Sequence, residues 1–459
     1  MIHRYQKKGL NFVLDVNSGA VHLLDDISYA VSGLLDENMG DTCPQSIIDA
    51  LPDYTADEIR EAYDELYELK KAGQLFAQDD YIDVSRYIPV NAPVKALCLH
   101  VAHDCNLRCK YCFASTGDFG QGRKIMPPEI AKKAIDFVIA RSGVRHNIEV
   151  DFFGGEPLMA WDTVTQTVDY ARSLEEKYNK KFRFTITTNG LLLDEDKRKY
   201  INENMDNCVL SLDSRREGND EFRKTVAGTG SYDTIVPKFK ALVDERDPNL
   251  DYYARGTFTS HNLDFAEDVL SIADAGFDRL SVEPVTADPG CGYDLTEDDL
   301  PKIEAEYDRL TDIMLERKKE GKPFTFFHFM VDLDQGPCVV KRLRGCGAGY
   351  EYVAVTPDGD IYPCHQFVGK DEFKQGSVLD QSFNMDIAQK FAGMNIYSRP
   401  KCQKCWAKFY CSGGCSAANY NMNHDMNDSY DLGCEMERKR LECAIYLKAM
   451  DKICANQSK

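Results

Sequence analysis

The most informative stretch for predicting the fold of this chain is Cys105-Asn-Leu-Arg-Cys109-Lys-Tyr-Cys112. Three thiols at this spacing bind three irons of a four-iron cluster, whereas a cluster that only carries electrons is normally closed by four thiolates. The stretch therefore indicates either a distant fourth ligand or an iron kept free for a substrate. It follows an apolar, strand-like run over residues 96–101.

That run is the first of six that alternate with helical stretches. The runs cover residues 96–101, 148–153, 182–188, 208–212, 252–259 and 280–284. The helices that follow them centre near residues 134, 168, 199, 238, 268 and 308. Right-handed crossovers turn repeated βα units into a parallel sheet or barrel, with chemistry in the loops after the strands. We therefore expect an α/β fold, a partial (βα)6 barrel, with the cysteine loop at its active end.

Two further units flank this barrel, which we place at residues 94–321. Residues 1–80 pattern as short strands, three helices and a returning strand over 74–77, an arrangement that resembles a winged helix. Residues 81–93 form a polar linker. Cysteine density rises in residues 322–459, so we expect a small, loop-rich domain there that metal organises more than a large core does.

The charge of the chain limits its partners. Its 459 residues carry a formal net charge of -20, and residues 1–80 hold 6 Lys and Arg against 16 Asp and Glu, a net charge of -10. This unit would repel a nucleic acid, so we expect it to bind a peptide along a free strand edge instead. The 17 cysteines cluster at ligand-like spacings, which favours metal ligation over disulfides. With no membrane-length apolar run and no signal-peptide core, we expect a cytoplasmic protein.

Glycine-rich and polar segments follow the second, third and fourth strands. They are Gly154-Gly155-Glu156-Pro157, Thr188-Asn189, and Ser211 with Arg223 twelve residues later. Paired glycines admit a ligand close to the backbone, Glu156 offers a carboxylate for a cation, and Arg223 suits a carboxylate. Each segment alone is more often an ordinary turn. Their position at consecutive strand ends favours a shared site.

The CxxxCxxC loop, the Gly-Gly-Glu-Pro segment and the six βα units together resemble the radical S-adenosylmethionine (SAM) superfamily. The resemblance covers residues 94–320 and implies that SAM chelates the free iron of a catalytic cluster on the three cysteines. Electron transfer into that cluster then cleaves SAM to a 5'-deoxyadenosyl radical, which removes a hydrogen atom from the substrate. By resemblance, Gly154, Gly155, Glu156 and Pro157 hold the methionyl amine, Thr188 and Asn189 the ribose, Ser211 and Arg223 the carboxylate, and Tyr111 lies near the adenine.

The cysteine-rich tail resembles the SPASM domain, which holds two auxiliary [4Fe-4S] clusters. By resemblance, Cys402, Cys405, Cys411 and Cys434 close one cluster, and Cys346, Cys364 and Cys415 supply three ligands of the other. Either Cys338 or a thiolate of the substrate is its fourth ligand. The alternative for the tail is a pair of zinc sites, each closed by four cysteines.

The chain as a whole resembles the maturases of the six-cysteines-in-forty-five-residues (SCIFF) peptides. The stretches 11–22 and 345–356 contribute to this resemblance. It implies thioether crosslinks from peptide cysteine sulfur to a carbon of an acceptor residue, often threonine. The partners implied are a Cys-rich precursor peptide, whose leader binds residues 1–80, and a flavodoxin- or ferredoxin-type electron donor. The cofactors implied are SAM and three [4Fe-4S] clusters.

Two other functions compete with this hypothesis. An anaerobic sulfatase maturase, which oxidises Cys or Ser to formylglycine, shares the barrel and the tail but normally lacks a unit such as residues 1–80. A non-catalytic iron-sulfur electron-transfer or sensor protein would have no use for the polar segments at the strand ends. Formation of 5'-deoxyadenosine separates that last class from the two enzymes.

Overall fold

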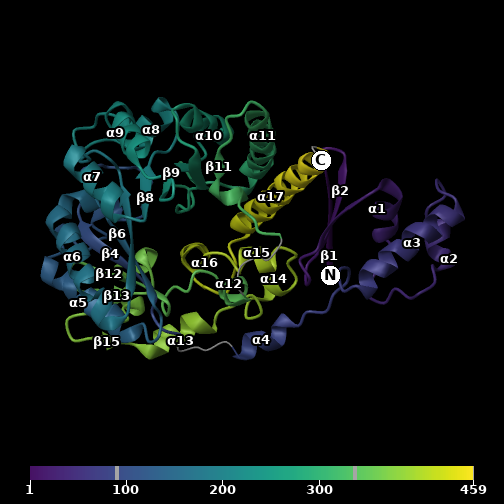
Figure 1. Cartoon of the computed structure of the whole chain (residues 1–459), viewed down its shortest axis with the longest axis horizontal. Helices are drawn as coiled ribbons and strands as arrows, with labels where there is room; N and C mark the ends of the chain where they lie inside the picture. The colour runs from purple at the N-terminus through teal and green to yellow at the C-terminus, as the bar shows by residue number, and fades with distance from the viewer. Residues whose placement is uncertain (88–91, 334–338, 458–459) are drawn as a thin grey trace.

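A sheet of mainly parallel strands forms the centre of the larger part of the molecule (Figure 1). The computed structural model describes residues 1–87, 92–333 and 339–457. All six predicted runs are strands of this sheet, each within two residues of the predicted bounds. They are β4 (Ala96–His103), β6 (Asn147–Gly154), β7 (Lys181–Thr188), β8 (Asn207–Ser211), β9 (Asp251–Phe258) and β10 (Arg279–Pro284). The predicted α/β fold is therefore confirmed.

The sheet continues beyond these six strands at both edges. β11 (Thr325–Phe326) lies parallel to β10, and β12 (Tyr352–Val355) lies parallel to β4. The remaining strands are β5 (Lys124–Ile125), β13 (Asp360–Tyr362), β14 (Gly376–Ser377) and β15 (Ser382–Phe383). The strand order runs from β11 to β15 without returning, so the sheet is open. β12, from the tail that was expected to be loop-rich and organised by metal, supplies the backbone partners that the edge of β4 needs.

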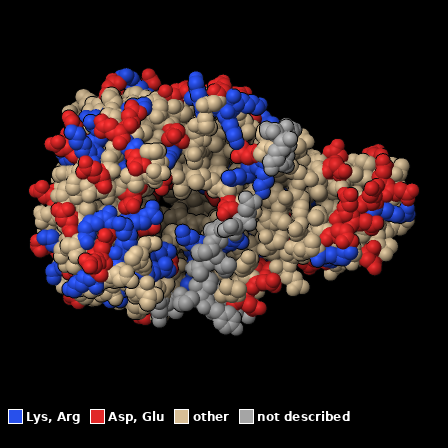
Figure 2. Space-filling view, in the orientation of Figure 1, with Lys and Arg blue, Asp and Glu red and all other residues tan. Residues whose placement is uncertain are grey.

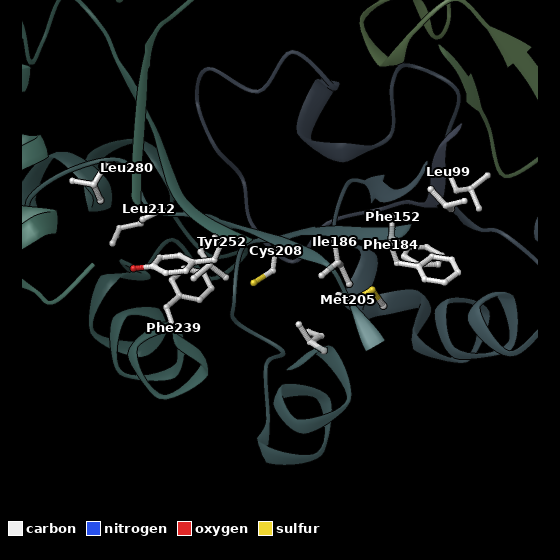
Figure 3. Packing of buried hydrophobic residues seen from close by; sticks show 14 of the residues in the cluster. Leu99, Phe152, Phe184, Ile186, Met205, Cys208, Leu212, Phe239, Tyr252 and Leu280 are labelled. Carbon is white, nitrogen blue, oxygen red and sulfur yellow. The ribbon is translucent and has the colours of Figure 1, made fainter. Parts of the chain in front are cut away.

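Helices cover one face of the parallel strands, so that every second residue of a strand such as β7 is buried, whereas β4 is buried along its whole length. In β7, Phe182, Phe184 and Ile186 are fully buried. Figure 3 shows side chains of this core, including Met205 and Phe239. The helices are α5 (Pro128–Arg141), α6 (Trp161–Tyr178), α7 (Glu195–Asn204), α8 (Arg216–Phe222), α9 (Tyr232–Glu245), α10 (Phe265–Asp274) and α11 (Leu300–Lys319). Residues of the opposite face remain available to line a site.

The N-terminal unit is a three-stranded antiparallel sheet with three helices. Its elements are β1 (Ile2–Lys7), β2 (Leu10–Asp15), β3 (Val21–Leu24), α1 (Asp26–Ser32), α2 (Gln45–Ala50) and α3 (Ala56–Lys71). The returning strand expected over residues 74–77 is absent, because Phe76 has a left-handed φ of 52° that breaks an extended backbone. Acidic side chains gather on this unit, at the right of Figure 2.

The hairpin of β1 and β2 attaches this unit to the end of the chain. Tyr5 and Phe12 pack with Ile445 and Tyr446 of α17 (Asp431–Gln457). His3 stacks on Trp406, with ring centroids 3.8 Å apart, and its Nε2 lies 2.9 Å from the carboxylate of Glu442. The first and last parts of the sequence therefore form one packed assembly.

The other α-helices of the described chain, apart from α17, are short. They are α4 (Tyr81–Tyr87), α12 (Val339–Arg344), α13 (Met385–Gly393), α14 (Pro400–Gln403), α15 (Lys408–Cys411) and α16 (Ser416–Asn423), of which α4 precedes the barrel. Within the described parts of the chain, no helix is both long and apolar enough to span a bilayer.

Candidate active site

The cysteine loop leaves β4 and is fixed by backbone hydrogen bonds to the segment after α8. The amide of Arg108 donates to the carbonyl of Lys224 at 2.7 Å, and the amide of Lys110 donates to that of Phe222 at 3.1 Å. Leu107 and Thr225 form an isolated β-bridge. The position of the loop therefore depends on main-chain geometry.

The three thiols of this loop lie close enough to affect one another. Burial raises the pKa of Cys105 to about 12, and Glu156 and the thiols of Cys109 and Cys112 add to this shift. Burial also raises the pKa of Cys109, to about 11. Such thiols lose their protons only when a cation replaces them, which suits ligands of a metal cluster.

The paired glycines permit close contact between the end of β6 and the cysteine loop. A Cβ on Gly155 would collide with the carbonyl of Asp104 and lie 3.0 Å from that of Gly117. Gly154 has a φ of 132°, and a Cβ there would collide with the carbonyl of Ala102. At both positions the space that a side chain would occupy is filled by backbone of this chain, and the predicted contact of these glycines with a ligand stays a prediction. Only glycine tolerates this approach.

Glu156 joins the ends of β6 and β7. Its carboxylate is buried and accepts hydrogen bonds from the Thr188 hydroxyl at 2.7 Å, the Asn189 amide at 2.8 Å and the Leu158 amide at 3.1 Å. Burial raises its pKa, although the donors oppose this. Both oxygens are thus already bonded within the protein. Pro157 directly follows and opens a single 3-10 turn, Pro157–Ala160.

Asn189 connects the end of β7 to the cysteine loop. Its Nδ2 donates to Asn106 Oδ1 at 2.7 Å and to Cys105 Sγ at 3.5 Å. Its Oδ1 accepts from the Leu191 amide at 3.0 Å. Asn189, predicted as a cofactor contact, therefore lies beside the first cysteine, and Thr188 precedes it in the chain.

Tyr111 and Arg223 meet at Asp213, to which the sequence analysis assigned no role. The Tyr111 hydroxyl donates to the Asp213 carboxylate, and Arg223 Nη1 donates to the Tyr111 oxygen at 3.0 Å. Arg223 and Asp213 also form a buried ion pair with 3.5 Å between Nη1 and Oδ1. Arg223 Nε and Asp213 Oδ1 are buried without a hydrogen-bond partner in the described structure. Asp213 follows Ser211 by two residues, which was the signal available to find it.

These groups line a cavity on the face of the sheet opposite the helices. Its volume is about 220 Å³, and Thr187, Ser211, Asp213 and Arg223 contribute to its wall. A larger cavity of about 510 Å³ adjoins it, and Tyr111, Phe113 and His365 line both. Figure 2 shows a hollow in the middle of this face of the molecule. The cysteine loop thus borders a space that reaches the tail.

The cysteines of the tail form two groups. Cys402, Cys405, Cys411 and Cys434 line one cavity of about 330 Å³. Burial raises the pKa of Cys434 to about 11, and the thiols of Cys402 and Cys405 add to this shift, whereas Arg438 lowers it.

Cys364, Cys346 and Cys415 make up the second group. Burial raises the pKa of Cys364 to about 12, with further contributions from the Cys415 and Cys346 thiols. Cys346 and Cys415 are exposed, whereas Cys364 is buried. Cys338, the possible fourth ligand, lies outside the described residues. Among the described residues, no three Cys, His, Asp or Glu side chains converge as ligands of one metal ion would.

Comparison with known protein families gives these parts a name. Residues 99–251 match the radical SAM superfamily, and residues 346–406 match SPASM, an iron-sulfur cluster-binding domain. The chain has a radical SAM domain and a SPASM domain. The cysteine loop belongs to the first, and the second begins at Cys346.

Relatives and solved structures agree with this assignment. A cysteine-type anaerobic sulfatase-maturating enzyme of Clostridium novyi is 25% identical over 72% of this chain and 90% of its own length. The radical SAM cyclopropyl synthase TigE of Paramaledivibacter caminithermalis is 24% identical over 72% of this chain and 70% of its own. The fold is similar to that of Streptococcus suis SuiB bound to S-adenosylmethionine, with a TM-score of 0.53, 18% identity and coverage of 94% of this chain and 98% of SuiB.

The site of the radical SAM domain fits the cofactors of this superfamily. The cysteine loop provides three grouped thiols, and the adjacent cavity holds a buried cation and a buried carboxylate with unused hydrogen-bonding atoms. A ligand with both amino and carboxylate groups could satisfy these atoms. The first tail group fits a closed cluster, because four thiols surround one cavity.

A polar network behind the cavity was not found from the sequence. Arg255 and Glu283 line the cavity as an ion pair, and His328 Nε2 lies 3.8 Å from Glu283. On the far side, Arg440 Nη1 lies 3.3 Å from His328 Nδ1 and therefore donates to it. Burial, with Arg440 nearby, lowers the pKa of His328 to about 3. These residues come from β9, β10, the turn after β11 and α17, so no local pattern connects them.

Proposed function

We propose that the protein is a radical SAM maturase that installs thioether crosslinks in a Cys-rich, ribosomally made peptide. One observation above all supports this proposal. The cavity of about 510 Å³ is bordered by Cys112 on one side and by His365 and Gln366, which directly follow Cys364, on the other. A peptide in this space would lie between the radical SAM cysteines and the second SPASM group.

The residues of the first site would divide the work of binding SAM. Cys105, Cys109 and Cys112 would hold the cluster, and Gly154 to Pro157 with Thr188 and Asn189 would border the cofactor. Ser211 and Arg223 would bind its carboxylate, with Tyr111 and Asp213 orienting the guanidinium through their hydrogen bonds. Once bound, SAM and a reduced cluster supply a 5'-deoxyadenosyl radical, which removes a hydrogen atom from the acceptor carbon.

The SPASM domain would take part in the second half of the reaction. In each crosslink a C–H bond and an S–H bond break and a C–S bond forms, so the peptide loses two hydrogens, about 2 Da. The 5'-deoxyadenosyl radical would take the hydrogen atom from carbon, and a base or solvent would take the proton from sulfur. An auxiliary cluster would accept the one remaining electron. The exposed Cys346 and Cys415 would leave that cluster accessible to a peptide thiolate. Burial lowers the pKa of His365 to about 4, which keeps this residue neutral and makes it a weak base, so the proton would pass to solvent.

The N-terminal unit would bind the leader of the peptide. Its edge strands are β1 and β3, and β1 already contacts α17 through its side chains, which favours β3 for pairing with an added strand. Its acidic surface favours a basic or neutral leader. SuiB of Streptococcus suis, which has also been solved with its precursor peptide SuiA, shares the fold over 93% of this chain, with a TM-score of 0.52 and 17% identity.

Incubation with reductant, SAM and a Cys-rich precursor peptide tests the proposal. We expect 5'-deoxyadenosine and a mass loss of about 2 Da per crosslink, with fragmentation mapping the bond from sulfur to carbon. A precursor without its leader should be modified more slowly, while SAM cleavage continues. Formylglycine in place of a crosslink would favour the sulfatase-maturase alternative, and a complete absence of 5'-deoxyadenosine would contradict both enzymes.

A further inference from the structure

Arg399 occupies the junction of the two cysteine groups in the SPASM domain. The side chain belongs to a residue only 3% exposed, and its Nη1 donates to the Gly413 carbonyl at 2.7 Å. Its Nη2 donates to the Ser416 hydroxyl at 3.0 Å. Both acceptors lie in or next to the loop that runs from Cys411, of the first group, to Cys415, of the second. The guanidinium is therefore attached to the segment that joins the groups.

The loop is shaped around this side chain. Gly413 has a φ of 88°, and a Cβ at this position would collide with Arg399 Nη1. A side chain other than hydrogen would displace the guanidinium from its acceptors. Glycine at position 413 therefore leaves room for the Arg399 guanidinium, in addition to permitting the turn.

The charge of Arg399 is not balanced by a carboxylate. In the described parts of the chain, no Asp or Glu forms an ion pair with it, and its Nε is buried without a hydrogen-bond partner. Thiols of both groups interact electrostatically with it: Cys402 and Cys411 of the first group, and Cys415 and Cys346 of the second. An unpaired buried cation is costly, so the negative charge of ligated thiolates is the natural counterpart.

We propose that Arg399 sets the reduction potentials of both auxiliary clusters. A fixed positive charge stabilises the more negative, reduced form of a nearby cluster and so raises its potential. Because one guanidinium is hydrogen-bonded to the segment that joins the two groups and interacts with thiols of both, its effect is shared, and it keeps both clusters able to accept an electron from the substrate. This inference depends on the two auxiliary clusters of the proposed function, but not on the identity of the peptide product.

Redox titration of the reconstituted full-length protein, followed by electron paramagnetic resonance, tests this role without SAM or peptide. In Arg399→Gln we expect both auxiliary potentials to fall, with iron content unchanged. Arg438→Gln is the matched control, because Arg438 Nη1 lies 3.9 Å from Cys405 Sγ of the first group alone. That control should lower one potential only. A shift of one potential, or of neither, in Arg399→Gln would overturn the proposal.

Arg399→Lys keeps the test decisive if the glutamine variant loses its clusters. The lysine retains the charge but cannot reach both acceptors, so both potentials should stay near those of the unmodified protein. A fall of either potential as large as that from removal of Arg438 would show that charge is not the cause. If the potentials behave as expected but no crosslink forms in any peptide, the proposed reaction fails and the role of Arg399 stands.

Discussion

The cysteine loop of the radical SAM domain and the cysteines of the SPASM domain are positioned by different means. The first three thiols come from eight residues, and backbone hydrogen bonds attach that loop to the segment at the end of α8. The tail cysteines are spread from Cys346 to Cys434, and short helices and a buried arginine hold them. The geometry of the first site is therefore set by the fold. The geometry of the tail cysteines depends in addition on the balance between the charge of the arginine and that of the thiolates that a metal cluster would bind.

Loss of the first cysteine group should have the largest effect. Replacing Cys105, Cys109 and Cys112 by Ala is expected to abolish both 5'-deoxyadenosine formation and peptide modification, because the variant loses all three thiols that the cysteine loop supplies to that cluster. Chromatography and mass spectrometry measure the two products. Persistence of 5'-deoxyadenosine in this triple variant would show that the site is misassigned.

Loss of a tail ligand should separate the two halves of the reaction. Cys434→Ala is expected to eliminate crosslinking while leaving SAM cleavage measurable, since the first site does not depend on α17 for its ligands. Cys454→Ala, an exposed position on the same helix, is the control and should behave like the unmodified protein. Equal loss of both products in Cys434→Ala would mean that the two regions are not independent.

A single methyl group should disturb the first region through its backbone. Gly155→Ala would push the Asp104 carbonyl aside, and we expect the free energy of unfolding to fall by about 1–3 kcal/mol. Displacement of the loop should reduce the rate of SAM cleavage by about 100-fold. The control is Gly393→Ala, where an added Cβ meets no atom within 4 Å. Equal rates in the two variants would contradict the tight packing of loop and strand.

The network behind the cavity should give the smallest effect, which depends on pH. His328 is neutral when folded, with a pKa of about 3, and takes up a proton near pH 6.5 when unfolded. The unfolding free energy should therefore fall as the pH is lowered from 6.5 towards 3. At pH 5 this residue should lower the free energy of unfolding by about 2 kcal/mol relative to its value at pH 7. Urea titration of His328→Gln at both values should show a correspondingly weaker pH dependence, and an unchanged one would contradict the assignment.

Much of the fold follows from patterns that lie within short stretches of sequence. The alternation of buried residues in β7 and the helical spacing after it occur within about 20 residues, so all six strands were predicted correctly. The pairing of β12 with β4 was missed, because no local pattern records a contact between distant segments. The return strand at 74–77 was wrong, since the left-handed φ of Phe76 is not encoded by a glycine.

The site was predictable where residue type alone defines the chemistry. The cysteines and the Gly-Gly pair could be assigned to the site from the sequence alone. The glycines lie against the cysteine loop of the same chain. Asp213 and Arg399 were not assigned, because a carboxylate or a guanidinium gains its role from neighbours brought by other elements. Assignment of the cofactor contacts and of Cys338 remains a prediction.

The parallel pairing of β12 with β4 also constrains how the chain is made. The ribosome releases β4 about 250 residues before β12, which at 5–20 residues per second is on the order of 10–50 s. Throughout that interval most of one edge of β4 has no strand beside it, while the cysteine loop next to it is already synthesised. Nascent chains would thus spend this time open to pairing with other strands, and cluster insertion has its natural place after β12 has joined the sheet.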